Sequence, residues 1–195
     1  PINAVKIFND KEVDELIFLD VDATKLKREP NLDLLKNIAS ECFMPLAYGG
    51  GISSVKNAED VINVGIEKIV LNSSALVNPT LINELSKVLG SQSVVVAIDA
   101  KNTIFGDYII FSHSSKKRAN YNLLEYIKMI QDLGAGEIFI NSVNRDGMMT
   151  GYDIELIKLI LDQAEVPLVF CGGASSLDDF IEVSINNLVF GTIFL

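Results

Sequence analysis

The chain has 195 residues, of which 49% are hydrophobic and 22% charged, a composition typical of a soluble globular protein. The formal net charge of −10 and the lack of a basic stripe argue against a nucleic-acid-binding protein. We see neither a signal peptide nor an apolar run approaching about 18 residues, so we expect no membrane association and a cytoplasmic location.

Short apolar runs alternate with amphipathic patterns along the whole chain. The runs are apolar at nearly every position, which is typical of strands buried on both faces of a parallel sheet. The predicted strands are residues 16–21, 45–48, 68–71, 94–98, 137–140, 167–170 and 188–193. The segments between them predict helices, so the chain is an α/β protein of repeated βα units. A long interruption at residues 101–120 contains residues 108–111, which we expect to pair in a small extra hairpin.

The second half of the chain repeats the first. Three pairs of similar segments carry the repeat, two at an offset of 122 residues and one at 119. They are residues 15–19 with 137–141, residues 49–53 with 171–175, and residues 72–73 with 191–192. Two equivalent halves predict a (β/α)8 TIM barrel built from two half-barrel repeats of four βα units each.

On this scheme the chain is a single barrel domain over residues 1–195, with strands 2 to 8 visible and residues 94–98 opening the second half. We therefore expect the first βα unit and the last helix to be absent from the given sequence. The shorter third offset predicts that a few residues are also missing between Phe180 and Leu188. An open doubly wound sheet is the alternative architecture, but it does not explain the repeat.

Glycine and hydroxyl residues follow four of the predicted strands. In a (β/α)8 barrel the chemistry lies at the carboxyl ends of the strands, where glycine lets backbone N–H groups approach an anion. The residues are Gly51, Asn72 and Ser73 at the third and fourth strands, and Gly173, Gly191 and Thr192 at the seventh and eighth. Two such cradles predict a small ligand with a phosphate at each end. The alternative is that the glycines only permit tight turns.

Carboxylates lie at the same ends of the strands. Asp99 directly follows the apolar run 94–98, and a partly buried Asp can act as a general acid or base. The alternative is that Asp99 anchors a loop or Lys101. For Asp146 both interpretations stay open, catalysis or the anchoring of a loop beside the phosphate.

Charged residues stand at the opposite, amino ends of three strands. Glu15, Lys68 and Glu137 begin strands 2, 4 and 6, and alternate strands of a barrel contribute to one layer of side chains. This layer predicts either an ion-pair plug or a gate for a small polar molecule entering from below. The chain holds one histidine, His113, and two cysteines without CxxC spacing, so we expect no metal site and no cofactor.

Seven longer motifs follow one another along the chain. They are Asp-Glu-Leu-Ile-Phe-Leu-Asp (14–20), Tyr-Gly-Gly-Gly-Ile (48–52), Val-Ala-Ile-Asp-Ala-Lys (96–101), Gly-Ala-Gly-Glu-Ile (134–138), Asn-Arg-Asp-Gly (144–147), Gly-Tyr-Asp (151–153) and Gly-Gly-Ala (172–174). Together they resemble the cyclase subunit of imidazole glycerol phosphate synthase, a lyase of histidine biosynthesis. The resemblance implies a heterodimer in which a glutaminase subunit docks at the amino-terminal face of the barrel and supplies ammonia. It also implies a bis-phosphorylated aminoimidazole ribonucleotide as substrate and imidazole glycerol phosphate as product.

The resemblance implies roles for individual residues. The catalytic positions are Asp99 and Ser114, and a second catalytic Asp lies on the family's first strand, outside this sequence. The first phosphate site matches Gly51, Asn72 and Ser73, and the second matches Gly147, Gly173, Gly191 and Thr192, with Asp146 beside it. The ammonia gate matches Glu15, Lys68 and Glu137.

Some positions depart from the family pattern. Asn144 stands where the family usually has Asp, and Met148 where it usually has Thr. Residues 19–25 look closer to a paralogue group encoded with surface-polysaccharide genes, whose barrel is thought to supply ammonia to an N-acetyl sugar amidotransferase. The alternative function is therefore an ammonia conduit for that reaction. A phosphosugar isomerase on the same duplicated half-barrel is a third interpretation, but it would have no use for the gate.

Overall fold

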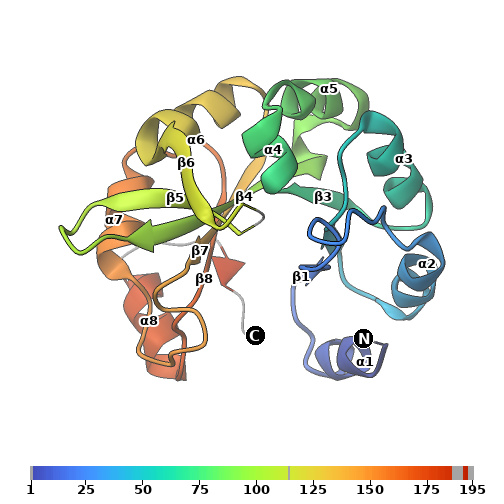
Figure 1. Cartoon of the computed structure of the whole chain (residues 1–195). Helices are drawn as coiled ribbons and strands as arrows, with labels where there is room; N and C mark the ends of the chain where they lie inside the picture. The colour runs from blue at the N-terminus through green and yellow to red at the C-terminus, as the bar shows by residue number, and fades with distance from the viewer. Residues whose placement is uncertain (1, 114, 186–190, 193–195) are drawn as a thin grey trace. The chain divides into compact units, whose positions relative to one another are not determined.

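The structure is a computed structural model that describes residues 2–113, 115–185 and 191–192. The chain divides into two compact units, Pro1–Val95 and Val96–Leu195. The division falls within the segment 94–98, which the repeat predicted to open the second half. The prediction of two half-barrel repeats therefore agrees with the division of the fold, and each unit is described by itself (Figure 1).

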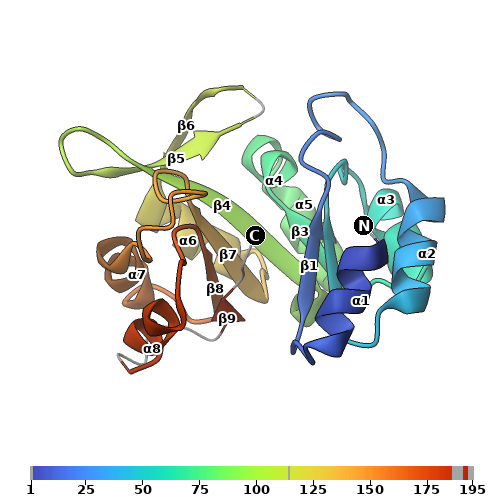
Figure 2. The same cartoon turned by 90° about the horizontal axis from the view of Figure 1, so that it is seen from below.

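The first unit consists of a short parallel sheet with helices between its strands. Its elements are α1 (Ile2–Asp10), β1 (Leu16–Leu19), α2 (Leu32–Glu41), β2 (Leu46–Gly49), α3 (Val55–Asn63), β3 (Lys68–Leu71), α4 (Ser73–Val77), α5 (Thr80–Leu89) and the 3-10 turn η1 (Ser91–Ser93). Strand β2 lies between β1 and β3 and pairs in parallel with both. Figure 2 shows α2 and α3 running along one face of these strands.

Helix α1 corrects one expectation. The sequence patterns place the first βα unit outside the given sequence. The structure has a helix at Ile2–Asp10, which buries Val5 and attaches to the loop after α2. The attachment is made by Asn9, whose Nδ2 donates to the Glu41 carbonyl at 2.6 Å and whose Oδ1 accepts from the Phe43 N–H at 3.1 Å.

The second unit combines parallel strands with an antiparallel hairpin. Its elements are β4 (Val94–Asn102), β5 (Tyr108–Ser112), β6 (Lys117–Asn122), α6 (Leu123–Asp132), β7 (Glu137–Ser142), α7 (Ile154–Leu161), β8 (Leu168–Cys171), α8 (Leu177–Ile185) and β9 (Gly191–Thr192). Strands β7, β8 and β9 pair in parallel, and β4 lies beside β7. Strand β5 pairs antiparallel with the end of β4 and with β6, so the predicted extra hairpin is confirmed. Figure 2 shows this hairpin standing out from the parallel strands.

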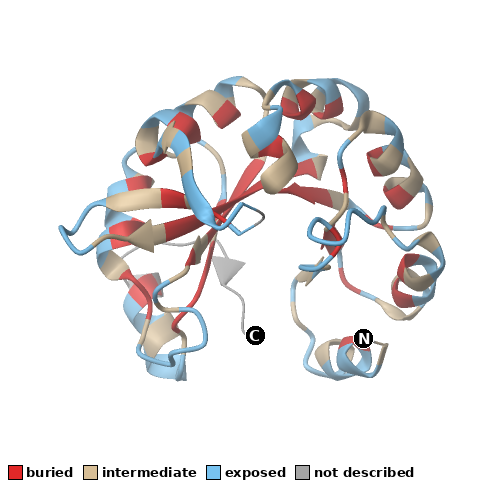
Figure 3. Cartoon of the chain, viewed as in Figure 1, coloured by how far each residue is buried: buried red, intermediate tan, exposed pale blue. Residues whose placement is uncertain are grey.

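The core of each unit lies between its strands and its helices. Buried positions concentrate on the strands and on one face of each helix (Figure 3). In β2 all four residues are buried, and β4 buries its first seven, as expected for strands covered on both faces. The repeated βα units confirm the α/β fold of the (β/α)8 class. A single domain over residues 1–195 stays a prediction, and no helix in the described part of the chain is long and apolar enough to span a membrane.

Candidate functional site

The first predicted phosphate site lies at the carboxyl edge of β2 and β3. Gly49 pairs with Val70, so Gly51 and Asn72 follow neighbouring strands at the same edge of the sheet. Gly51 has φ +69°, and a Cβ at this position would collide with the carbonyl oxygen of Arg28. Glycine is thus required here both by its backbone conformation and by the loop that packs against it. Ser73 opens α4, with Asn72 as the preceding residue.

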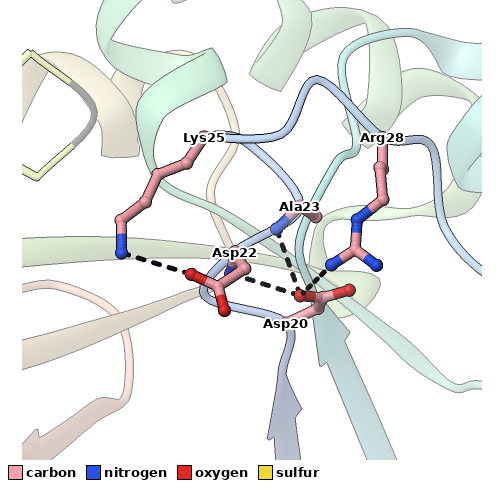
Figure 4. Close-up of polar contacts among 5 residues, drawn as sticks. All are labelled: Asp20, Asp22, Ala23, Lys25 and Arg28. Atoms are coloured by element: carbon pink, nitrogen blue, oxygen red, sulfur yellow. Dashed lines mark hydrogen bonds and ion pairs between the residues drawn. The ribbon is translucent and has the colours of Figure 1, made fainter.

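The loop that packs on Gly51 is held by one carboxylate (Figure 4). Asp20 Oδ1 accepts hydrogen bonds from the backbone N–H groups of Asp22 at 3.2 Å and Ala23 at 3.1 Å. The guanidinium of Arg28 lies 3.5 Å from the same oxygen, and the Arg28 N–H donates to the Ala23 carbonyl at 2.8 Å. These bonds close the chain after β1 into a compact turn, so Asp20 has a structural role at this edge.

The second predicted phosphate site lies at the carboxyl edge of β7, β8 and β9. A Cβ on Gly173 would collide with the carbonyl of Gly151, and the Gly151 N–H donates to the Gly173 carbonyl at 2.8 Å. The Asp146 N–H donates to the Ser142 carbonyl at 2.9 Å, which holds the loop after β7. Gly147 in this loop has φ +71° and nothing within 4 Å of its Cβ position, so the loop faces open space there. The backbone of Gly191–Thr192 pairs with β8, which brings it to the same edge.

Asp99 is a buried carboxylate of the second unit. It lies on β4 and is 8% exposed. The side-chain amide of Asn141, on β7, donates to its Oδ1 at 2.9 Å, and His113 Nε2 lies 3.7 Å from the same oxygen. Lys101, considered as a structural partner of Asp99, has its ammonium group 5.0 Å from the centre of the Phe111 ring. Ser114, the other predicted catalytic residue, lies outside the described residues.

Asn141 and His113 were not singled out as partners of Asp99 from the sequence. The sequence does hold a signal for Asn141. It is the polar residue that directly follows the apolar run of β7, just as Asp99 directly follows the apolar run of β4. His113 has no such signal, because its position depends on how the hairpin after β4 folds back. Asn141 lies 42 positions from Asp99, whereas His113 directly follows β5.

A second buried carboxylate ties the hairpin to the parallel strands. Asp153 is 8% exposed and accepts hydrogen bonds from the Tyr108 hydroxyl at 2.7 Å, the Ser142 hydroxyl at 3.2 Å and the Leu156 N–H at 3.2 Å. The last bond caps α7. Burial and the bond to Asp153 raise the pKa of Tyr108 above its ordinary range, so this phenol stays protonated as the donor.

Two of the three predicted gate residues meet at the amino edge of the first unit. Lys68 Nζ lies 2.8 Å from Glu15 Oε2, and both side chains are partly buried. The pair spans from the start of β3 to the residue before β1, across β2, in which Ala47 is the register partner of Lys68. Glu137, the third residue, begins β7 in the second unit and is 7% exposed.

Cys171 ends β8 next to the second predicted phosphate site. Burial, with the nearby charge of Asp146 and then that of Asp99, raises the pKa of its thiol to about 11, although the Gly172 N–H opposes this shift. A thiol with so high a pKa is almost wholly protonated at neutral pH and is a poor nucleophile. Cys171 therefore acts as a packing residue beneath the loop.

Comparison with known proteins identifies the family to which the chain belongs. The model of the family described as "Histidine biosynthesis protein" matches residues 1–195. The chain is 44% identical to the Pseudomonas aeruginosa protein named "Putative imidazole glycerol phosphate synthase subunit hisF2", over 94% of this chain and 73% of that protein. It is 47% identical to "Putative imidazole glycerol phosphate synthase subunit HisF" of Leptospira borgpetersenii, over 91% and 70%.

A third relative is the "Imidazole glycerol phosphate synthase subunit HisF" of Petrotoga mobilis, 41% identical over 94% of this chain and 73% of that protein. These identities extend over most of the chain, and they agree with the α/β fold and with the resemblance read from the motifs. The chain therefore belongs to the histidine biosynthesis protein family, among its members of the imidazole glycerol phosphate synthase HisF type.

Proposed function

We propose that this protein is the cyclase subunit of an imidazole glycerol phosphate synthase. It receives ammonia from a glutaminase subunit and uses it to convert a bis-phosphorylated aminoimidazole ribonucleotide to imidazole glycerol phosphate. The observation that carries the proposal is the setting of Asp99, a buried carboxylate at the carboxyl end of a strand, oriented by Asn141. Such a group suits proton transfer to and from a substrate bound at that edge.

Substrate binding is assigned to the two glycine-containing edges. Gly51, Asn72 and Ser73 in the first unit and Gly147, Gly173, Gly191 and Thr192 in the second would each bind one terminal phosphate. The close approach of another loop's backbone to Gly51 and to Gly173 supports this assignment. Because glycine has no side chain, backbone groups of both loops can lie together at each edge. Two such edges would suit a substrate that carries a phosphate at each end.

Ammonia delivery is assigned to the amino edges of the strands. In β7 alternate residues share a face, so Glu137, Phe139 and Asn141 lie on one side of the strand. The four-residue step from Glu137 to Asn141 is roughly 13 Å at the usual strand rise. A small neutral molecule that passes Glu137 and follows this face would therefore arrive beside Asp99. The gate role is assigned to the Lys68–Glu15 pair in the first unit and to Glu137 in the second, and the glutaminase would dock at the amino ends of the strands.

One departure from the family pattern has a structural explanation. The Asn144 side-chain oxygen accepts a 2.8 Å hydrogen bond from the Asn102 N–H at the end of β4. An Asp at this position would offer the same acceptor, so the substitution keeps the bond that holds the hairpin. It does not by itself require a different substrate.

The test is turnover of the cyclase substrate by the full-length protein with ammonium salt at high pH, followed as loss of the substrate's absorbance. We expect turnover in the wild type and a loss of at least about 100-fold in kcat for Asp99→Asn. The matched control is Asp107→Asn, an exposed Asp in the same hairpin, which should keep wild-type kinetics. No turnover by a folded wild-type protein would refute the cyclase function.

The same preparation tests the alternative function, an ammonia conduit for an N-acetyl sugar amidotransferase. A conduit without cyclase activity would bind a glutaminase and stimulate ammonia transfer to the amidotransferase, but it would leave the cyclase substrate unchanged. Glutaminase binding alone supports both functions, so substrate turnover decides between them.

A further inference from the structure

The single histidine of the chain lies beside the proposed catalytic carboxylate. His113 Nε2 is 3.7 Å from Asp99 Oδ1, a separation that a small rotation of the ring would reduce to hydrogen-bond distance. Asn141 donates to the same oxygen, so Oδ1 is approached by an amide from β7 and by an imidazole from the segment after β5.

Exposure differs sharply between the two partners. The Asp99 side chain is 11% exposed, whereas the His113 side chain is 53% exposed. A carboxylate that accepts a proton in each cycle must also release it, and a buried one needs a route to solvent. Histidine is the side chain that most readily gains and loses a proton near neutral pH, and this one touches both the carboxylate and the solvent.

The imidazole is held in place by the hairpin. Its ring packs edge-on against Phe111, with the ring centres 5.0 Å apart and the planes at 88°. The Tyr108–Asp153 hydrogen bond anchors the start of the same strand. The ammonium of Lys101 lies over the same Phe111 ring. Phe111 of β5 thus contacts the His113 ring, and the Tyr108–Asp153 hydrogen bond fixes the start of β5.

We propose that His113 is a positioning residue for Asp99 and the route by which Asp99 exchanges protons with solvent. The proposal rests on the proposed function. Asp99 accepts a proton from the reacting centre and becomes neutral. The proton then passes to Nε2 once the ring has rotated into hydrogen-bond distance, while Nδ1 releases its proton to solvent. This leaves the carboxylate and a neutral imidazole protonated on Nε2, and one proton has moved from substrate to water. Proton exchange of the exposed ring with solvent then returns the imidazole to the tautomer protonated on Nδ1. The reverse sequence supplies a proton to the substrate.

The kinetic test uses His113→Ala and His113→Phe. For His113→Ala we expect kcat to fall about 10- to 100-fold with KM changed less than about two-fold, because substrate binding does not involve the ring. Imidazole added to the buffer should restore most of the lost kcat in a saturable way. His113→Phe keeps an aromatic ring against Phe111 but fills the space, so it should lose kcat without rescue. An unchanged kcat in His113→Ala, or a loss that imidazole does not restore, would overturn the proposal.

A second measurement does not depend on turnover. Because His113 is the only histidine, the ring C–H signals of a histidine-labelled sample belong to it alone. Asp99→Asn should move these signals, whereas Asp107→Asn on the same hairpin should leave them in place. If Asp99→Asn leaves the signals unchanged, the contact is not populated and the proposal fails. If the signals move but the wild type does not turn over the substrate, the contact stands and the proposed cyclase function fails.

Discussion

The hydroxyl of Tyr108 donates a 2.7 Å hydrogen bond to Oδ1 of Asp153, although 45 positions separate the two residues in the sequence. This bond joins the hairpin strand β5 to the start of α7. Asp153 also accepts from the Ser142 hydroxyl and the Leu156 N–H, so one buried carboxylate fixes three elements. The setting of His113 and the loop of the second proposed phosphate site both depend on these elements.

Loss of this carboxylate should destabilise the protein more than loss of one donor. Tyr108→Phe removes a single bond, and we expect a fall of about 1 kcal/mol in the free energy of unfolding. Asp153→Ala removes the helix cap and leaves two hydroxyl groups without their acceptor, so we expect a fall of about 2–4 kcal/mol. Urea denaturation measures both. Asp162→Ala, an exposed Asp at the other end of α7, is the control and should change stability by less than about 0.5 kcal/mol. Equal losses in Asp153→Ala and Asp162→Ala would contradict the central role of Asp153.

The glycines at the two proposed phosphate edges can be compared with a glycine of positive φ that lies in open space. Gly51, Gly173 and Gly106 all have positive φ, but only Gly106 has nothing within 4 Å of its Cβ position. Gly106→Ala should therefore lower the free energy of unfolding only by the backbone strain of a positive φ, about 1–2 kcal/mol. Gly51→Ala and Gly173→Ala should cost about 1–3 kcal/mol more, because the new methyl group meets a backbone carbonyl. Both should also weaken binding of inorganic phosphate, measured by calorimetry, whereas Gly106→Ala should not. Equal stability losses at all three positions would show that the close approaches are not maintained in solution.

The Lys68–Glu15 pair should contribute to stability because it is partly buried. Lys68→Met leaves the Glu15 carboxylate without its cation, and we expect a loss of about 1–2 kcal/mol. Lys56→Met breaks an exposed pair with Asp60 at 3.7 Å and should cost less than about 0.5 kcal/mol. Thermal unfolding of the two variants measures the difference. If the pair also serves as a gate, Lys68→Met should change glutamine-dependent turnover more than turnover with external ammonia.

The raised pKa of Cys171 predicts a specific loss of stability at high pH. Its ordinary value of 9.0 rises to about 11 in the folded protein, chiefly by burial, so the folded state holds the thiol proton more tightly than the unfolded state. The resulting stability is fully present below pH 9 and is lost as the pH rises through about 11. Cys171→Ala lacks this contribution, so its unfolding free energy should fall less than that of the wild type across the same interval. Parallel pH profiles for the two proteins would contradict the prediction.

The same thiol should react slowly with disulfide reagents. In a Cys42→Ser background only Cys171 remains, and at pH 8 about one thiol in a thousand is ionised if the pKa is about 11. We expect slow labelling that accelerates with pH and becomes fast on unfolding. The reciprocal variant, Cys171→Ser, reports the half-buried Cys42 under the same conditions. Rapid labelling of folded Cys42→Ser protein at pH 8 would show that Cys171 is more accessible than its burial indicates.

Much of the fold could be predicted from the sequence because its strands are locally distinctive. The run 68–71 was predicted with the bounds that β3 has, and 137–140 lies within β7. Strands buried on both faces must be apolar at consecutive positions, and that property is visible without any tertiary contact. The repeat likewise placed the start of the second half at residues 94–98, where the two units divide.

The surroundings of the candidate site were decided by the tertiary structure. Strand β4 continues beyond the predicted residue 98 to Asn102, because its polar end pairs antiparallel with β5, a contact that local hydrophobicity does not record. Asn141 reaches Asp99 from 42 positions away, and the hairpin returns His113 to the same oxygen. The sequence by itself determined which residue types stand at the ends of the strands. Which of them meet depended on strand register and hairpin geometry, because hydrogen bonds between side chains form only after distant segments have packed.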